Sequence, residues 1–156
     1  MLLKKAVDTS TLELIKALQS RDYLKGFYLV GGTALAIYMD HRRSVDIDLF
    51  SNQSFDASQL LENIHQDFNY QLFHTALNTI KGSISDIKVD ILAHRYPYLQ
   101  APQNIDGILL LSKQDIIAMK LNAISTSGQR SKDFIDLFYL LDIYNLADML
   151  SFYKTK

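Results

Sequence analysis

The stretch YLVGGTALAIYMDHRRSVDIDLFS, Tyr28–Ser51, contains the two features that decide the fold of this chain. The first is a short apolar run that ends in two adjacent glycines, Gly31 and Gly32. Residues 34–39 follow with helix-forming side chains and no helix breaker. Glycine at such a junction permits backbone conformations that other residues avoid, so the pair predicts a turn from a buried strand into a helix.

The second feature is an Asp-Ile-Asp in a predicted strand, Val45–Phe50. Alternate side chains of a strand share a face, so Asp46 and Asp48 point the same way and their Cα atoms lie roughly 6.5–7 Å apart. Two carboxylates about 4 Å apart repel by roughly 4 kcal/mol at an effective dielectric of about 20, unless a cation lies between them. A pair of solvated aspartates at an exposed strand end is the commoner explanation of this pattern alone.

The glycines also suit a ligand. Without a Cβ they leave the backbone N–H groups of a helix N-terminus open to a phosphate, which the helix dipole favours. Thr33 adds a hydroxyl in the first turn. The alternative is a plain strand-to-helix turn with Thr33 as its cap.

A third carboxylate occurs in the segment DIKVDILAH. Lys88 and Asp90 would share one face of a strand, with Val89 and Ile91 on the other. Asp90 therefore interrupts an otherwise apolar segment, although a solvent-facing position would also explain it. Three carboxylates on neighbouring strands beside a glycine-rich anion site are the arrangement expected for two-metal phosphoryl or nucleotidyl transfer.

The rest of the sequence predicts a small mixed sheet with helices before, within and after it. Ser10 and Glu13 suggest a capping box for a first helix. Further strands are predicted at residues 70–75, 79–84, 87–93 and 108–111; further helices from Ser54 or Asp56 and at residues 113–124 and 132–144; and a loop at residues 96–106. We expect a single α+β domain over residues 1–156, with a catalytic core up to about residue 111 and C-terminal helices after it.

Composition excludes several classes of protein. The 156 residues carry 16 basic and 17 acidic side chains, a net charge of −1, so bulk charge does not predict nucleic-acid binding. With no cysteine, disulfides and thiolate metal sites are excluded. The charged N-terminal residues do not resemble a secretory signal, and no apolar run is long enough to cross a bilayer. We therefore expect a cytoplasmic protein without membrane contacts.

These motifs resemble the polymerase-beta-like nucleotidyltransferases, and more closely the AbiEii/AbiGii abortive-infection toxins. That family carries Gly-Gly-Thr-Ala-Leu and then Arg-x-Ser-x-Asp-Ile-Asp-Leu-Phe, which are residues 31–35 and 42–50 here. The resemblance implies the polymerase-beta-like fold. It also implies catalytic, metal-binding roles for Asp46, Asp48 and Asp90, and triphosphate binding by Gly31, Gly32 and Thr33.

A later family segment, a helical lysine followed by Arg-x-Lys-Asp-Phe-x-Asp-Leu, matches Lys120 and residues 130–137. By this resemblance Lys120 is catalytic. The remaining nucleotide-binding set is Arg42, Ser44, Arg130, Lys132, Asp133 and Asp136. Helical geometry places Lys120 roughly 60° from the centre of an apolar face, within reach of phosphate, although a snorkelling lysine would sit there too. Phe134, Phe138 and Leu141 are expected to form a core stripe beside Asp133 and Asp136.

The expected function is that of a Mg²⁺-dependent nucleotidyltransferase, with Mn²⁺ as a substitute, that moves a nucleoside monophosphate from an NTP to an acceptor hydroxyl. The resemblance suggests the toxin of a type IV toxin–antitoxin or abortive-infection system, with tRNA as acceptor and a cognate antitoxin as partner. A basic cluster of Lys113, Lys120, Arg130 and Lys132 would serve tRNA binding. The alternatives are a small-molecule transferase of the antibiotic-modifying type and a catalytically idle nucleotide-binding or interaction module.

Overall fold

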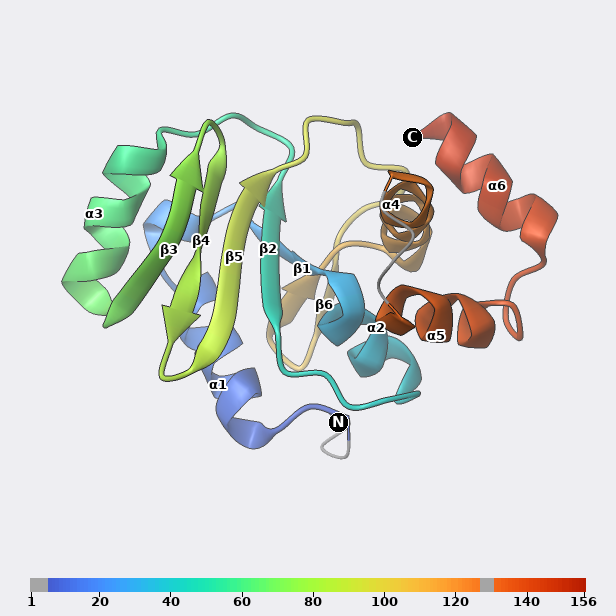
Figure 1. The fold of residues 1–156 in the computed structure, drawn as a ribbon, viewed down its shortest axis with the longest axis horizontal. Helices are drawn as coiled ribbons and strands as arrows, with labels where there is room; N and C mark the ends of the chain where they lie inside the picture. Colours follow the sequence, from blue (N-terminus) through green and yellow to red (C-terminus); the bar gives the residue numbers. More distant parts are fainter. Residues whose placement is uncertain (1–5, 127–130) are drawn as a thin grey trace.

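A computed structural model describes residues 6–126 and 131–156 of the chain (Figure 1). Its strands are β1 (Tyr28–Val30), β2 (Ile47–Ser51), β3 (Tyr70–Ala76), β4 (Thr79–Ile84), β5 (Ile87–Ala93), β6 (Gln103–Ile105) and β7 (Ile108–Leu110). Its helices are α1 (Thr9–Gln19), η1 (Asp22–Leu24), α2 (Gly31–Met39), α3 (Ala57–Asp67), α4 (Lys113–Thr126), α5 (Ser131–Leu140) and α6 (Leu146–Thr155). The mixed α/β architecture agrees with the predicted fold class.

All seven strands form one mixed sheet in the order β3-β4-β5-β2-β1-β7-β6. The central strand β2 runs antiparallel to β1 and parallel to β5, while β1 runs parallel to β7. The hairpin β4–β5 and the edge strand β3 extend the sheet on one side. In Figure 1, α3 lies next to β3 at one end of the sheet, and α4, α5 and α6 gather at the other. This order brings the glycine turn after β1 beside the start of β2.

The core follows the alternation of the strands. In β2, Ile47 and Leu49 are fully buried and face away from Asp48. In β5, Val89 and Ile91 are fully buried, as the pattern predicts. Among residues 6–126 and 131–156, no helix has the length and apolar character needed to span a bilayer.

Several element ends differ from the sequence prediction. Helix α1 starts at Thr9 after Asp8, so Ser10 is not its cap. Helix α2 already starts at Gly31. Of the two predicted caps of α3, the structure has Asp56, which accepts a hydrogen bond from the Gln59 amide. The predicted loop at residues 96–106 contains β6, and the predicted helix at residues 132–144 ends at Leu140, before a separate helix α6 that the pattern does not indicate.

The predicted core stripe on α5 is wrong. Phe134, Phe138 and Leu141 are 48%, 65% and 46% exposed, whereas Asp133 and Asp136 are buried. The helix turns its carboxylates inward because cationic side chains from α4 and from the loop between α2 and β2 meet them there.

Candidate active site

The backbone conformation at Gly31 and the small space beside Gly31 and Gly32 both favour glycine in this turn. Gly31 has φ +75°, a value that favours glycine. A Cβ at this position would lie 2.7 Å from Oδ2 of Asp48, and one at Gly32 would overlap the guanidinium group of Arg42. The sequence therefore needs glycine at both positions for the first turn of α2 to approach Asp48 and Arg42 this closely.

Asp48 and Asp90 lie side by side. They are direct Cα partners in the neighbouring parallel strands β2 and β5, and Val30 opposes Asp48 from β1. Asp90 is 5% exposed; its Oδ2 lies 3.3 Å from Nζ of Lys88, and its buried Oδ1 has no hydrogen-bond partner within the part of the chain that the structure describes. A buried carboxylate oxygen without a partner costs free energy, which a ligand at this point would recover.

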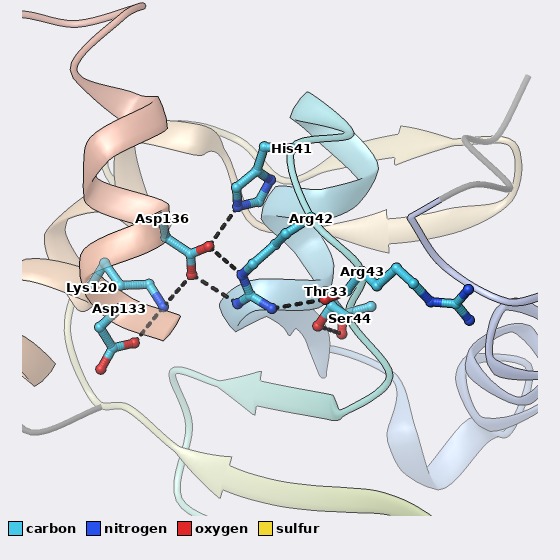
Figure 2. Close-up of polar contacts among 8 residues, drawn as sticks. All are labelled: Thr33, His41, Arg42, Arg43, Ser44, Lys120, Asp133 and Asp136. Atoms are coloured by element: carbon cyan, nitrogen blue, oxygen red, sulfur yellow. Dashed lines mark hydrogen bonds and ion pairs between the residues drawn. The ribbon is translucent and has the colours of Figure 1, made fainter. Parts of the chain in front are cut away.

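Asp46 precedes β2, and its position depends on two hydroxyl groups. Thr33 donates a hydrogen bond to the carbonyl oxygen of Asp46, and its Oγ1 lies 2.7 Å from Oγ of Ser44 (Figure 2). Both hydroxyls are buried, so in this structure they fix the backbone before β2. Within residues 6–126 and 131–156, no three acidic or histidine side chains lie close enough to form a preformed metal site. Asp46, Asp48 and Asp90 are thus not gathered into one.

A buried charge network joins three elements around Asp136, whose side chain is fully buried (Figure 2). Its carboxylate accepts hydrogen bonds from Nε and Nη2 of Arg42, at 2.7 and 3.0 Å, and lies 2.5 Å from Nε2 of His41. Nζ of Lys120 lies 2.8 Å from Asp136 and 2.7 Å from Asp133. The network ties α5 to α4 and to the loop after α2.

The network also fixes the ionisation of Asp136. Burial raises the pKa of its carboxyl, but hydrogen bonds from His41 and Arg42 and the charge of Lys120 together hold it well below its usual value. Asp136 is therefore ionised at neutral pH. With Asp133 it balances the two positive charges of Arg42 and Lys120 in a poorly hydrated region.

The glycine turn, the β2 carboxylate and the charge network meet at one cavity of about 150 Å³. Its lining combines charged groups with an apolar wall from β1, β2 and α4: Val30, Gly31, Asp48, Phe50, Ile116, Met119, Lys120, Ala123 and Asp133. A chamber with a carboxylate, an ammonium group and a helix N-terminus can hold a phosphorylated ligand beside a cation.

The structure thus brings Gly31, Asp48, Lys120 and Asp133 to the cavity and places Asp90 next to Asp48. Arg42 and Asp136 pair with each other and are not among the residues that line the cavity. Lys132 is exposed on α5, and Arg130 lies outside the described residues. The predicted ligand roles of these side chains stay predictions.

Sequence reasoning missed His41 and Phe50. His41 contacts a residue 95 positions away in the chain, and Phe50 follows Asp48 on the same strand face. Strand alternation, from which Asp46 and Asp48 were predicted to share a face, also puts Phe50 on the face of Asp48. The sequence pattern could therefore have predicted Phe50 at the site. No local pattern marks His41.

The family model described as nucleotidyl transferase AbiEii toxin, type IV toxin–antitoxin system, matches residues 13–154. The chain belongs to the AbiEii family. The match contains the glycine turn, the Asp-Ile-Asp segment and the Lys120 network, so the predicted family is confirmed.

Known proteins support the same fold. This AbiEii chain is 33% identical over 133 residues to the uncharacterized protein aq_aa25 of Aquifex aeolicus, covering 83% of this chain and 64% of that protein. JHP933 of Helicobacter pylori is similar in structure, with a TM-score of 0.58 and 20% identity over 88% of this chain and 68% of that one. The antibiotic-resistance factor ANT(2'')-Ia gives a TM-score of 0.67 at 16% identity, over 94% of this chain and 89% of that one. The predicted nucleotidyltransferase fold is confirmed. The AbiEii chain spans about two thirds of the length of the Aquifex relative.

Proposed function

We propose that this chain transfers a nucleoside monophosphate from an NTP to an acceptor hydroxyl. One observation carries the proposal: Asp48 and Asp90 stand in register next to a glycine turn that starts a helix, and Lys120 lines the same cavity as Asp48. Family membership supports this reading. The reaction needs a site for phosphates, a site for a divalent cation and a wall that orients the nucleotide.

We assign phosphate binding to the first turn of α2. Gly31 lines the cavity and begins the helix, Gly32 follows it, and the dipole at a helix N-terminus favours an anion. Lys120 faces this chamber from α4, and its charge is shared with Asp133 and Asp136 rather than free. This pairing holds the ammonium group in place before the nucleotide arrives, so binding costs little side-chain entropy.

Family membership implies a divalent cation, and we propose magnesium, a hard ion that suits the acidic residues. Carboxylate oxygens are its preferred protein ligands, and Oδ1 of Asp90 is buried without a partner among the described residues. Asp48 and Asp90 would hold the ion, with Asp46 as a third ligand. Bound magnesium, or manganese in its place, supplies a Lewis acid for attack on the α-phosphate and for departure of pyrophosphate.

For the biology, we propose the toxin of a type IV toxin–antitoxin or abortive-infection system, acting in the cytoplasm with tRNA as acceptor and an antitoxin as partner. The family description supports the toxin role. Lys113 and Lys132 are the cations that we assign to the tRNA backbone. Neither belongs to the charge network around Asp136: Lys132 is exposed, and Nζ of half-buried Lys113 lies 5.7 Å from the centroid of the Tyr38 ring.

A small-molecule acceptor is the second candidate. The likeness to ANT(2'')-Ia, which covers most of both chains, favours it. The two candidates share the donor chemistry and differ only in the acceptor, so one assay separates them.

The test incubates the chain with each α-³²P-labelled NTP and magnesium, together with total tRNA, an aminoglycoside or no acceptor. We expect label on tRNA, and none with Asp48→Asn. Asp86→Asn, in the exposed turn before β5, is the matched control and should keep full activity. Label on the aminoglycoside alone would support the second candidate. No transfer to any acceptor and no release of pyrophosphate would contradict the proposal.

A further inference from the structure

A second cavity, of about 220 Å³, lies between the segment after β5, α4 and the C-terminal end of α6. It is lined by His94, Tyr96, Ala118, Asn122, Tyr153 and Lys156. Neither the predicted site nor the proposed phosphate and metal chemistry uses any of these residues. Tyr96 is 53% exposed, so one ring at the mouth of the cavity is open to a ligand.

The second cavity is next to the first. His94 follows β5 and stays beside β2, because its N–H donates to the carbonyl of Ser51. Asp90 lies in β5, four residues before His94 in the chain. Phe50 connects the two cavities: it lines the first, and its ring centroid lies 6.3 Å from that of His94. Asp48 and Phe50 are two residues apart, roughly 6.5–7 Å along the strand.

The rings form a continuous series that leads away from the carboxylates. After Phe50 and His94 comes Tyr96, whose centroid lies 4.6 Å from that of His94 at an angle of 40°. Burial lowers the pKa of His94, and the charge of Lys156 lowers it further against the opposing effect of Asp115, so the imidazole is neutral at pH 7. The series therefore presents flat, uncharged rings.

The remaining lining argues against an ionic ligand. Nζ of Lys156 lies 2.5 Å from Oδ1 of Asp115, so its positive charge is already compensated. Among the described residues, the lining includes no carboxylate, which a polycationic aminoglycoside would need. Asn122 supplies an amide that can both donate and accept hydrogen bonds, and Tyr153 supplies a hydroxyl. Flat rings with an amide at one edge suit a planar heteroaromatic ring with its own donors and acceptors.

We propose that this second cavity binds a nucleobase, stacked on Tyr96 and hydrogen-bonded to Asn122, beside the cavity that contains Asp48. The proposal rests on the proposed nucleotidyl transfer and extends it, since the base belongs either to the NTP or to the nucleotide at the end of an RNA acceptor. Stacking on aromatic side chains tolerates any base. Hydrogen bonds to the Asn122 amide give the site its preference among bases.

The chain has no tryptophan, so Tyr96→Trp introduces a single fluorescent ring at the cavity. We expect nucleosides, NTPs or a short single-stranded RNA to quench its fluorescence, and tripolyphosphate, which has no base, to leave it unchanged. Phe73→Trp, on the exposed edge strand β3, is the matched control and should respond to none of them. Quenching by NTP assigns the donor base, and quenching by RNA in the presence of bound NTP assigns the acceptor base. Quenching by tripolyphosphate, or by no base-containing probe, would overturn the proposal.

A second pair of variants separates stacking from a structural role. Tyr96→Ala should weaken binding of the base-containing probe roughly 5- to 150-fold, measured by calorimetry, whereas Tyr96→Phe keeps the ring and should match the unsubstituted chain. Equal affinity of Tyr96→Ala and Tyr96→Phe would refute the site. Nucleoside binding needs neither metal nor turnover, so this test can succeed even if the chain transfers no nucleotide. If the chain transfers nucleotide but Tyr96→Ala does not weaken binding of the base, the nucleobase site is refuted and the proposed transfer is not.

Discussion

Replacing Asp136 by asparagine should lower the free energy of unfolding by about 3–5 kcal/mol, the usual cost of removing one partner from a buried charge pair. The side chains of Arg42 and Lys120 are 14% and 8% exposed and would keep their positive charges with only Asp133 to oppose them. The amide of asparagine has one acceptor oxygen, where the carboxylate accepts from three side chains. Domains are stable by about 5–15 kcal/mol, so the decrease is a large share of the total.

The assay is urea unfolding followed by circular dichroism. The midpoint should fall while the slope m stays unchanged, because the folded and unfolded surfaces hardly change. In thermal unfolding the decrease corresponds to about 6–20 °C, at about 2–4 °C per kcal/mol for a chain of this size. Asp142→Asn, an exposed carboxylate just after α5, is the matched control and should stay within about 0.5 kcal/mol. A decrease below about 1 kcal/mol in Asp136→Asn would refute the anchoring role of the network.

The carboxylate of Asp136 should also make the free energy of unfolding depend on pH. Because the folded chain holds the pKa of Asp136 below its ordinary value of 3.8, the stabilisation is fully present above that value and is lost as the pH falls toward the folded pKa. The free energy of unfolding should therefore fall more steeply below about pH 5 in the unsubstituted chain than in Asp136→Asn. Parallel curves for the two proteins would show that Asp136 is not the group that titrates.

Gly31→Ala should abolish NTP binding, because the added Cβ would meet the side chain of Asp48. The control is Gly26→Ala, since Gly26 has a similar positive φ but no atom within 4 Å of an added Cβ. This control tests backbone strain alone and should bind NTP normally. Equal NTP affinities in calorimetry would refute the close approach of the turn to Asp48. Lys113→Ala combined with Lys132→Ala should weaken tRNA binding and reduce its salt slope by about 0.7–0.9 for each phosphate that the protein no longer neutralises, with NTP binding unchanged. An unaltered slope would exclude this surface from tRNA binding.

Local rules were sufficient to predict the backbone turn and the strand faces at the centre of the candidate site. Strand alternation and the requirement for glycine act over a few residues, so the turn at Gly31, the orientation of Asp48 and the placement of Asp90 on the opposite face from Val89 could be inferred from the sequence. The pairing of β2 with β5 was not determined by any local pattern, but it places Asp48 directly beside Asp90.

Long-range contacts explain what the sequence did not predict. Asp136 is buried because Arg42, 94 residues earlier, neutralises it, and periodicity carries no information on such a partner. The same contact turns Phe138 outward, against the prediction from its apolar character. A substitution at Gly32 illustrates the consequence: a side chain there would displace Arg42 and disturb the network as well as the phosphate site, so it cannot test the phosphate site alone.

The central claim is that Asp48 and Asp90 hold the catalytic cation beside the glycine turn, and its most direct test is pyrophosphate release from NTP in Asp90→Asn as magnesium is titrated. The substitution keeps the shape of the side chain and removes the charge of the carboxylate whose Oδ1 has no partner among the described residues. Removal of a metal ligand at a reacting phosphate should cost several kcal/mol, so we expect at least about 100-fold slower release at any magnesium concentration. Asp86→Asn should behave as the unsubstituted chain. Release by Asp90→Asn at the unsubstituted rate, with the same magnesium dependence, would contradict the account.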